Sequence, residues 1–273
     1  HRSLIQKCKA MRNLNPLLLL IVLFLFEACS ESEEINPIEV KEEINANTNE
    51  PLDVESSDSI IEGYKSLQIT GYNVHVQLTA YRKDTLLTEE VISMVTASLL
   101  EIDTIGIPSN ILNEVKKTPI FIDWETTNGL AVYHPSLSWL QTNGYIAEKT
   151  RSIEISNIKN FKYWVQKNQP YIILHELTHA YHHRVLNDTQ IDITNAYNNA
   201  LAQNLYVDIP YDNGNGDIYD VSSAYALTNE FEFFAELTEA YFGKNDYYPF
   251  NRDDLKRYDE EGYEAIIKAW NLE

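Results

Sequence analysis

Near its middle the chain reads Leu174-His175-Glu176-Leu177-Thr178-His179-Ala180, within an apolar run that suits a helix. A helix turns by about 100° per residue, so His175 and His179 lie one turn apart on the same face. Two imidazoles in this arrangement can bind one tetrahedral Zn²⁺. Glu176 lies beside them, where it can take a proton from a water molecule that the metal activates. A complete site then needs a third ligand from elsewhere in the chain.

The residues around this motif narrow the choice of site without settling it. The motif also occurs by chance on ordinary surface helices, and that alternative stays open. The apolar entry over residues 172–174 favours a buried His175, which would need a polar partner. One class of zinc peptidases continues the motif with a glycine and a third histidine, but this chain has His182 and Val185 at those positions. His182 and His183 remain alternatives, either as ligands or as part of a solvated helix face.

A stripe of three carboxylates downstream is the better source of a third ligand. Glu232, Glu236 and Glu239 lie at i, i+4 and i+7 of a helix predicted over residues 228–242. Three like charges on a half-buried face are costly unless a cation offsets them. A metal bound by Glu232, with Glu236 holding the second nitrogen of a ligand histidine, would remove that cost. The alternative is a capping box between Asn229 and Glu232, with the other two carboxylates in solvent.

The segment that contains this stripe resembles a known family. Residues 225–236 read Tyr-Ala-Leu-Thr-Asn-Glu-Phe-Glu-Phe-Phe-Ala-Glu. They match the pattern Y-x-x-T-N-E-x-E-F-F-A-E, which follows H-E-x-x-H in the anthrax-lethal-factor-type zinc metallopeptidases. The resemblance implies a gluzincin-like zincin domain that binds one Zn²⁺ per chain through His175, His179 and Glu232.

The same resemblance implies roles for three further residues. Glu176 would be the general base, Tyr225 would help to bind the tetrahedral oxyanion, and Glu236 would be the acid behind a ligand histidine. The resemblance covers about residues 171–242. The regions 124–164 and 247–250 are also similar to a group of uncharacterised secreted bacterial metallopeptidases, and neither resemblance identifies a substrate.

The order of predicted elements indicates an α+β domain over residues 60–273. We expect a small mixed sheet packed on the metal-site helix, followed by a mostly helical C-terminal half. Alternating or apolar runs predict strands over 67–80, 119–124, 130–133 and 152–157. Helices are predicted over 86–105 with Thr88 as N-cap, 108–115, 170–186, 192–205, 228–242 and 263–270. Residues 206–223 are predicted as a polar loop or hairpin.

Three other features have two readings each. The strand over residues 152–157 is either an edge that pairs with an extended peptide or an ordinary core strand. The oxygen-rich segment 212–217 could bind Ca²⁺, but Gly214 stands where a ligand is needed, so a tight turn is favoured. The segment His134-Pro135-Ser136 could line a cleft, but it is more simply a turn.

The N-terminal region has the pattern of an export signal. From Met11 a short basic stretch leads into the apolar run Leu17–Phe26, which is too short to span a bilayer. We predict a signal peptide over residues 1–28, of which 1–10 could precede the true start. Ala28-Cys29 is similar to the cleavage site of bacterial lipoproteins, which implies acylation of Cys29. Residues 29–59 are acidic and without apolar periodicity, and we predict a lipidated tether there.

Composition excludes one class of partner. The formal net charge of −20 argues against binding to a nucleic-acid backbone. We expect an exported monomer at the cell surface or outer membrane, or otherwise a secreted one, with contact to the membrane only through Cys29. The function that combines these features is a zinc-dependent metallopeptidase acting on peptides or proteins. The alternatives are a non-catalytic surface lipoprotein stabilised by zinc and a zinc amidase of cell-wall peptides.

Overall fold

The computed structural model of the protein describes residues 61–272, which form an α+β fold with a small mixed sheet. The predicted fold class is therefore confirmed. The predicted signal peptide, the acylated Cys29 and the acidic tether lie outside the described residues. No helix within residues 61–272 is long and apolar enough to cross a membrane.

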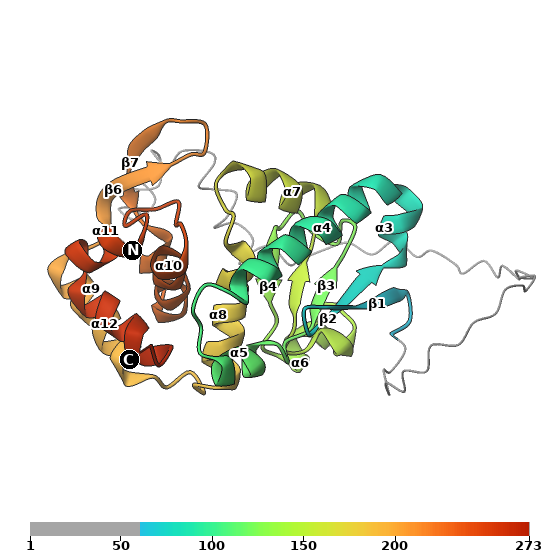
Figure 1. Cartoon of the computed structure of the whole chain (residues 1–273), viewed down its shortest axis with the longest axis horizontal. Coiled ribbons are helices and arrows are strands. Elements are labelled where there is room, and N and C mark those ends of the chain that lie inside the picture. The colour runs from blue at the N-terminus through green and yellow to red at the C-terminus, as the bar shows by residue number, and fades with distance from the viewer. Residues whose placement is uncertain (1–60, 273) are drawn as a thin grey trace, which may run out of the picture. The chain divides into compact units, whose positions relative to one another are not determined.

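The main sheet has five strands in the order β1-β2-β3-β5-β4 (Figure 1). The strands are β1 (Tyr64–Ile69), β2 (Tyr72–Gln77), β3 (Ile120–Ile122), β4 (Ala131–Tyr133) and β5 (Ile153–Ile155). The central strands β2, β3 and β5 are parallel, whereas the edge strands β1 and β4 run antiparallel to their neighbours. Every residue of β3 and β5 is buried, as expected for parallel strands that are covered on both faces.

The strand predicted over residues 67–80 is divided by a turn, which corrects that prediction. Thr70 and Gly71 both adopt positive φ, 49° and 92°, and Ile69 pairs directly with Tyr72 across the turn. Two central residues with φ > 0 match the twist of a tight hairpin, and glycine adopts this conformation without steric cost. The end of the predicted strand is helical instead, as α3 (Leu78–Lys83).

The position of β5 corrects a second prediction. Residues 153–155 form a strand as expected, but β5 lies between β3 and β4 and bonds to both. It therefore has no free edge for a peptide. The strand at this edge of the sheet is β4, which the sequence marked only as a short strand.

Helices pack on one face of the sheet and place the metal-site helix there. They are α4 (Thr85–Ile102), α5 (Ser109–Val115), α7 (Ile158–Lys167) and α8 (Ile172–Arg184) (Figure 1). Asp84, rather than the predicted Thr88, caps α4, because its side chain accepts a hydrogen bond from the backbone N–H of Leu87. Alternate strand residues such as Ile153 and Ile155 join the apolar core on this face.

The opposite face of the sheet is covered by the segment between β4 and β5. This segment contains α6 (Leu137–Thr142) and the 3₁₀ helix η3 (Ala147–Lys149), neither of which was predicted. Ser136 caps α6 by accepting a hydrogen bond of 3.3 Å from the backbone of Trp139. Residues 134–136 are therefore a short extended connection between β4 and α6 rather than the predicted turn.

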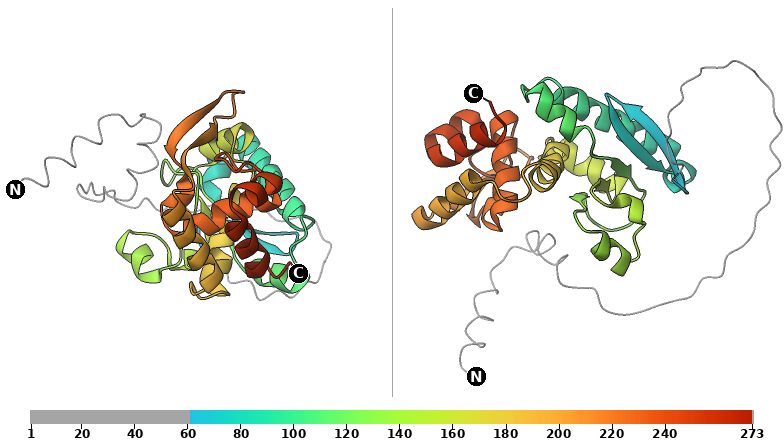
Figure 2. Two further views of the ribbon diagram at one scale, coloured as in Figure 1. Left: turned by 90° about the vertical axis from the view of Figure 1, so that its left-hand side faces the viewer. Right: turned by 90° about the horizontal axis from the view of Figure 1, so that it is seen from below.

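The C-terminal half is mostly helical, as predicted. Its elements are α9 (Ile191–Gln203), β6 (Val207–Asp212), β7 (Ile218–Ser223), the 3₁₀ helix η4 (Tyr225–Leu227), α10 (Glu230–Phe242), α11 (Arg252–Tyr258) and α12 (Glu260–Ala269) (Figure 2). Trp270, fully buried, stacks on Tyr181 of α8 with ring centroids 4.4 Å apart. This contact joins the end of the chain to the metal-site helix.

The oxygen-rich segment 212–217 is the turn of the β6–β7 hairpin. Asp212 accepts a hydrogen bond of 2.8 Å from the backbone of Gly214, whose φ is 73°, and its other oxygen pairs with Lys244. The Asp212 carboxylate is thus occupied by groups of the chain itself. The tight-turn interpretation is the one that the structure shows.

Candidate metal centre

Helix α8 places two imidazoles side by side. His175 and His179 lie one turn apart, and their ring centroids are 4.8 Å from each other. His175 is buried, and Glu176 next to it is buried as well. The apolar residues before the motif lie in the core, which explains why this turn of the helix is fixed in place.

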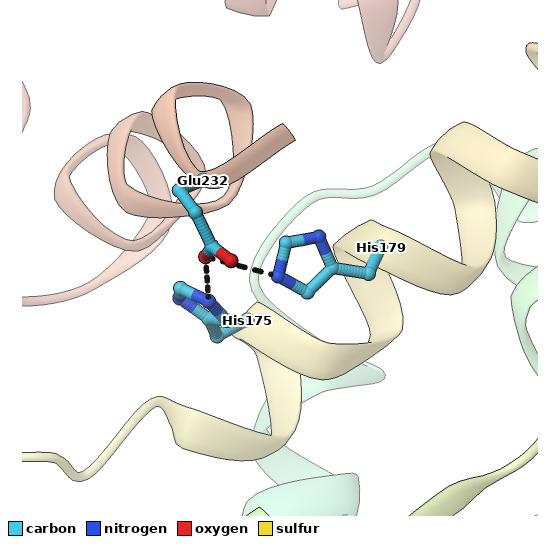
Figure 3. A group of neighbouring side chains, drawn as sticks. All are labelled: His175, His179 and Glu232. Carbon is cyan, nitrogen blue, oxygen red and sulfur yellow. Dashed lines mark hydrogen bonds and ion pairs between the residues drawn. The ribbon is translucent and has the colours of Figure 1, made fainter. Parts of the chain in front are cut away.

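Helix α10 brings a carboxylate to both imidazoles. The side chain of Asn229 accepts hydrogen bonds from the backbone of Phe231 and Glu232, both at 2.9 Å, and so caps the helix. This cap places Glu232 in the first turn, where its Oε2 lies 3.1 Å from Nε2 of His175 and 3.2 Å from Nε2 of His179 (Figure 3). The capping contact of Asn229 and the approach of Glu232 to the histidines therefore coexist.

The second nitrogen of His175 has a different partner from the predicted one. Nδ1 lies 2.7 Å from Oε1 of Glu239, whereas Glu236 is 3.8 Å away and accepts a hydrogen bond from Asn245. The contact predicted for Glu236 is therefore made by Glu239, and the prediction is wrong on this point. Glu239 belongs to the same stripe of carboxylates. Helical spacing alone does not show which residues of α10 lie opposite His175 of α8, so it could not distinguish Glu239 from Glu236.

The pKa values of Glu232 and His175 depend on each other, because both side chains are largely buried and in contact. Burial raises the pKa of Glu232, but hydrogen bonds from His175 and His179 outweigh it and hold that pKa well below its usual range. Burial lowers the pKa of His175, but its bonds to Glu232 and Glu239 outweigh it and raise that pKa well above its usual value. Both nitrogens of His175 thus face a carboxylate, so this group of side chains favours the binding of a cation.

The donor set fits a zinc ion. His175, His179 and Glu232, which we call the metal cluster, can each offer one ligand atom, and these atoms all lie within 4.8 Å of one another. In a tetrahedral site with metal–ligand distances of about 2.1 Å, the ligand atoms are roughly 3.3 Å apart. The observed contacts of 3.1 and 3.2 Å are close to that spacing. The hydrogen bond between Nδ1 of His175 and the accepting carboxylate of Glu239 would leave Nε2 of His175 free to bind the metal.

Glu176 lies between the metal cluster and the edge of the sheet. Burial raises its pKa, while the two neighbouring histidines and a hydrogen bond from the backbone N–H of Tyr133 lower it and leave the pKa above its usual value. A carboxylate with a raised pKa is a stronger base than a free one. The contact with Tyr133 connects Glu176 to β4.

Tyr225 of η4 lies on the other side of His175. The two ring centroids are 6.4 Å apart, and the planes are inclined by 31°. Burial raises the pKa of the Tyr225 phenol, and the charges of Glu232 and Glu176 raise it further, so the group keeps its proton and can donate it in a hydrogen bond. The structure thus brings together the predicted residues of the site around one end of α10.

The other histidines of α8 lie away from the metal cluster. His182 is buried against Phe231 and Phe234, with both pairs of ring centroids 5.2 Å apart. His183 meets the hydroxyl of Tyr133 at 2.9 Å through Nδ1. Neither belongs to the group of possible ligands, so the alternative that they extend the site is not supported.

Sequence reasoning missed the polar residues behind Glu236 and Glu239. Asp246 is buried and accepts a hydrogen bond of 3.1 Å from Asn168, which comes from a distant part of the chain. Burial first, and then the charge of Glu239, raise the pKa of Asp246 to about 8. Asn168 and Asp246 lie 78 positions apart in the sequence, so no local pattern could have predicted their contact.

Comparisons with known proteins return no relationship. No family model, no curated protein and no solved structure matches the chain. The residues and geometry of the chain itself are therefore the basis for its function.

Proposed function

We propose that the protein is a zinc-dependent peptidase with a zincin-like domain, in which His175, His179 and Glu232 hold one Zn²⁺. The observation that carries the proposal is the meeting of two Nε2 atoms from α8 with one carboxylate from α10, next to a buried Glu176. A purely structural site needs four protein ligands and no adjacent base. The pairing of three ligands with a base is typical of hydrolytic sites.

The residues around the metal cluster then have distinct tasks. Bound zinc would supply a Lewis acid that polarises a carbonyl and acidifies water. Glu176 accepts the proton of the attacking water and passes it to the leaving amine. The hydroxyl of Tyr225 donates a hydrogen bond to the oxygen on which negative charge develops. Glu239 keeps the ring of His175 oriented through Nδ1.

The edge strand β4 is the surface that would bind an extended peptide. The backbone groups of Leu130 and His134 form hydrogen bonds on the β5 side of β4. The backbone N–H and C=O groups of the alternate residues Ala131 and Tyr133 therefore point to the open side of the strand. The N–H of Tyr133 already reaches Glu176, which brings this edge next to the base. A peptide paired along β4 would therefore place a scissile bond beside Glu176.

We further propose that the domain acts outside the cytoplasm. This proposal is supported by the acidic tether and the acylated Cys29 that the N-terminal sequence indicates. Of the alternatives, a zinc amidase would use the same atoms and differs only in substrate. A non-catalytic zinc-stabilised lipoprotein would have no use for Glu176 or Tyr225. Activity is thus the property that distinguishes the proposals.

The decisive experiment compares purified wild-type chain with Glu176→Gln. Metal content is measured by elemental analysis, and cleavage is measured on a mixed peptide library and on cell-wall peptides. Removing a general base should lower the cleavage rate by about 10²- to 10⁴-fold with zinc content unchanged. Glu230→Gln, on the first turn of α10 but outside the metal cluster, is the control and should match wild type. Full cleavage by Glu176→Gln, or zinc-loaded wild type that cleaves nothing, would overturn the proposal.

A further inference from the structure

A second group of buried charges lies behind the sheet, away from the metal cluster. Glu154 is the middle residue of β5, and its side chain points away from the core that Ile153 and Ile155 share with α8. Lys149 at the end of η3 covers it from outside. We call Asp123, His134, Lys149 and Glu154 the lysine cluster. All four are at most 4% exposed.

Lys149 holds its amine between two carboxylates. Its Nζ donates a hydrogen bond to Oδ2 of Asp123 and lies 3.1 Å from Oε1 of Glu154. The rings of Phe121 and Tyr145 flank the same nitrogen, with centroids at 5.7 and 5.4 Å. An amine, a carboxyl group and a second carboxylate thus meet in a place that aromatic side chains shield from water.

The two carboxylates differ in their surroundings. Glu154 is held by His134, whose Nε2 lies 2.6 Å from Oε2, and by the hydroxyl of Thr126, which donates to Oε1 at 2.5 Å. Asp123 faces the hydroxyl of Tyr64 as well as Lys149, but its buried Oδ1 has no hydrogen-bond partner of normal geometry among the described residues. Burial raises the pKa of Asp123, although Lys149 opposes the shift, which favours the neutral carboxylic acid. The pKa of Glu154, in contrast, is lowered to about 2, because bonds from His134 and Lys149 outweigh burial.

We propose that Lys149 and Asp123 condense into an intramolecular isopeptide bond, with Glu154 as the group that transfers the proton. In this step Nζ first gives one proton to Oδ2 of Asp123 along the hydrogen bond that joins them, and the resulting amine attacks Cγ of the Asp123 carboxyl group. Glu154 takes a second proton from the nitrogen. Glu154 then returns that proton to the departing hydroxyl. One C–N bond forms, one C–O bond breaks and one water molecule leaves, so the step needs no oxidant, metal or further reactant.

Burial gives this reaction its driving force. In water an amine and a carboxylic acid are both ionised, which opposes amide formation. Inside the protein burial disfavours the charged form of Asp123, and the neutral amide would remove two buried charges at once. Proximity adds to the rate, because the reacting groups are already in contact.

The bond would have a structural use. It would close the segment 123–149, which carries the edge strand β4 and the cover of the back face, into a covalent loop. Residues 61–272 contain no cysteine, so a disulfide cannot fulfil this role. The inference concerns a different site from the metal cluster and does not depend on peptidase activity.

The experiment is peptide mapping of the denatured full chain after cleavage at glutamate. Cleavage after Glu114, Glu125, Glu148 and Glu154 separates Asp123, in the peptide 115–125, from Lys149, in the peptide 149–154. We expect one branched peptide that joins the two and is lighter by one water molecule than their sum. Fragmentation should place the junction at Asp123 and Lys149. If folded wild-type chain gives only the two linear peptides, the proposal is wrong.

Three variants assign the roles. Lys149→Arg keeps the positive charge but lacks a nucleophilic amine, so it should give linear peptides only. Glu154→Gln keeps the shape of the side chain but cannot accept the proton, and should lose the branched peptide while far-UV circular dichroism shows a folded chain. Glu176→Gln should form the bond as completely as wild type, because Glu176 is not part of the lysine cluster. A bond that persists in Glu154→Gln, or disappears in Glu176→Gln, would overturn the proposed chemistry.

Discussion

The metal cluster and the lysine cluster use similar residues in opposite ways. Each has a buried histidine bonded to a glutamate, at 3.1 Å for His175 and Glu232 and at 2.6 Å for His134 and Glu154. In the lysine cluster the chain supplies its own basic group, Lys149, which faces both carboxyl groups and, after the proposed condensation, is bonded to one of them. In the metal cluster the groups that pair with the carboxylates are histidines. A cation from outside the chain can therefore bind at one cluster, whereas Lys149 already occupies the equivalent place in the other.

The largest effect that tests this difference is expected for Glu232→Ala. It removes the one carboxylate within residues 61–272 that faces both Nε2 atoms, so zinc occupancy and cleavage should both fall to background. Isothermal titration with zinc measures the affinity, and Glu230→Gln serves as the matched control. Full zinc affinity in Glu232→Ala would show that the third ligand is a different residue.

The next effect in size is expected at the lysine cluster. Lys149→Met removes the partner that Asp123 and Glu154 share, whether that partner is held by a salt bridge or by the proposed amide, which should lower the free energy of unfolding by about 3–5 kcal/mol. Zinc affinity should remain that of wild type. Chemical denaturation measures the first property and titration the second. A variant as stable as wild type would contradict the view that Lys149 neutralises this cluster.

A smaller effect separates Glu239 from Glu236. Glu239→Gln weakens the bond to Nδ1 of His175 and should reduce zinc affinity by about 10- to 100-fold. Glu236→Gln should have less effect, since Glu236 is 3.8 Å from that nitrogen. If the two variants rank in the reverse order, the original assignment to Glu236 would be restored.

The last prediction concerns the pH dependence of stability. The pKa of Asp246 is raised to about 8 by burial and by the charge of Glu239, whereas an aspartate in an unfolded chain titrates near 3.9. Between these values the folded chain binds the extra proton, so metal-free protein should lose stability as pH rises from about 4 to about 8. Asp246→Asn should flatten this dependence in denaturation curves. Equal slopes in wild type and variant would show that Asp246 does not cause it.

Local patterns predicted most helices well. The apolar spacing in the ranges 86–105 and 192–205 was enough to predict α4 and α9, because a helix is formed by contacts within the same segment. Short elements such as α6 and α11 escaped, since six or seven residues give too little periodicity to recognise. The turn at Thr70 was missed because, of its two central residues, only Gly71 is of a type that indicates a positive φ.

The sequence by itself determined that His175, Glu176 and His179 share one turn of helix and that three glutamates share one face of another. Helical periodicity is sufficient for both statements. Only the tertiary structure decided that Glu239 meets His175, that β4 is the edge of the sheet, and that Lys149 lies between two carboxylates. The contact between His175 and Glu239 joins residues 64 positions apart, and that between Asp123 and Lys149 joins residues 26 positions apart, while the order of strands depends on the packing of the whole sheet, so no local periodicity predicts them.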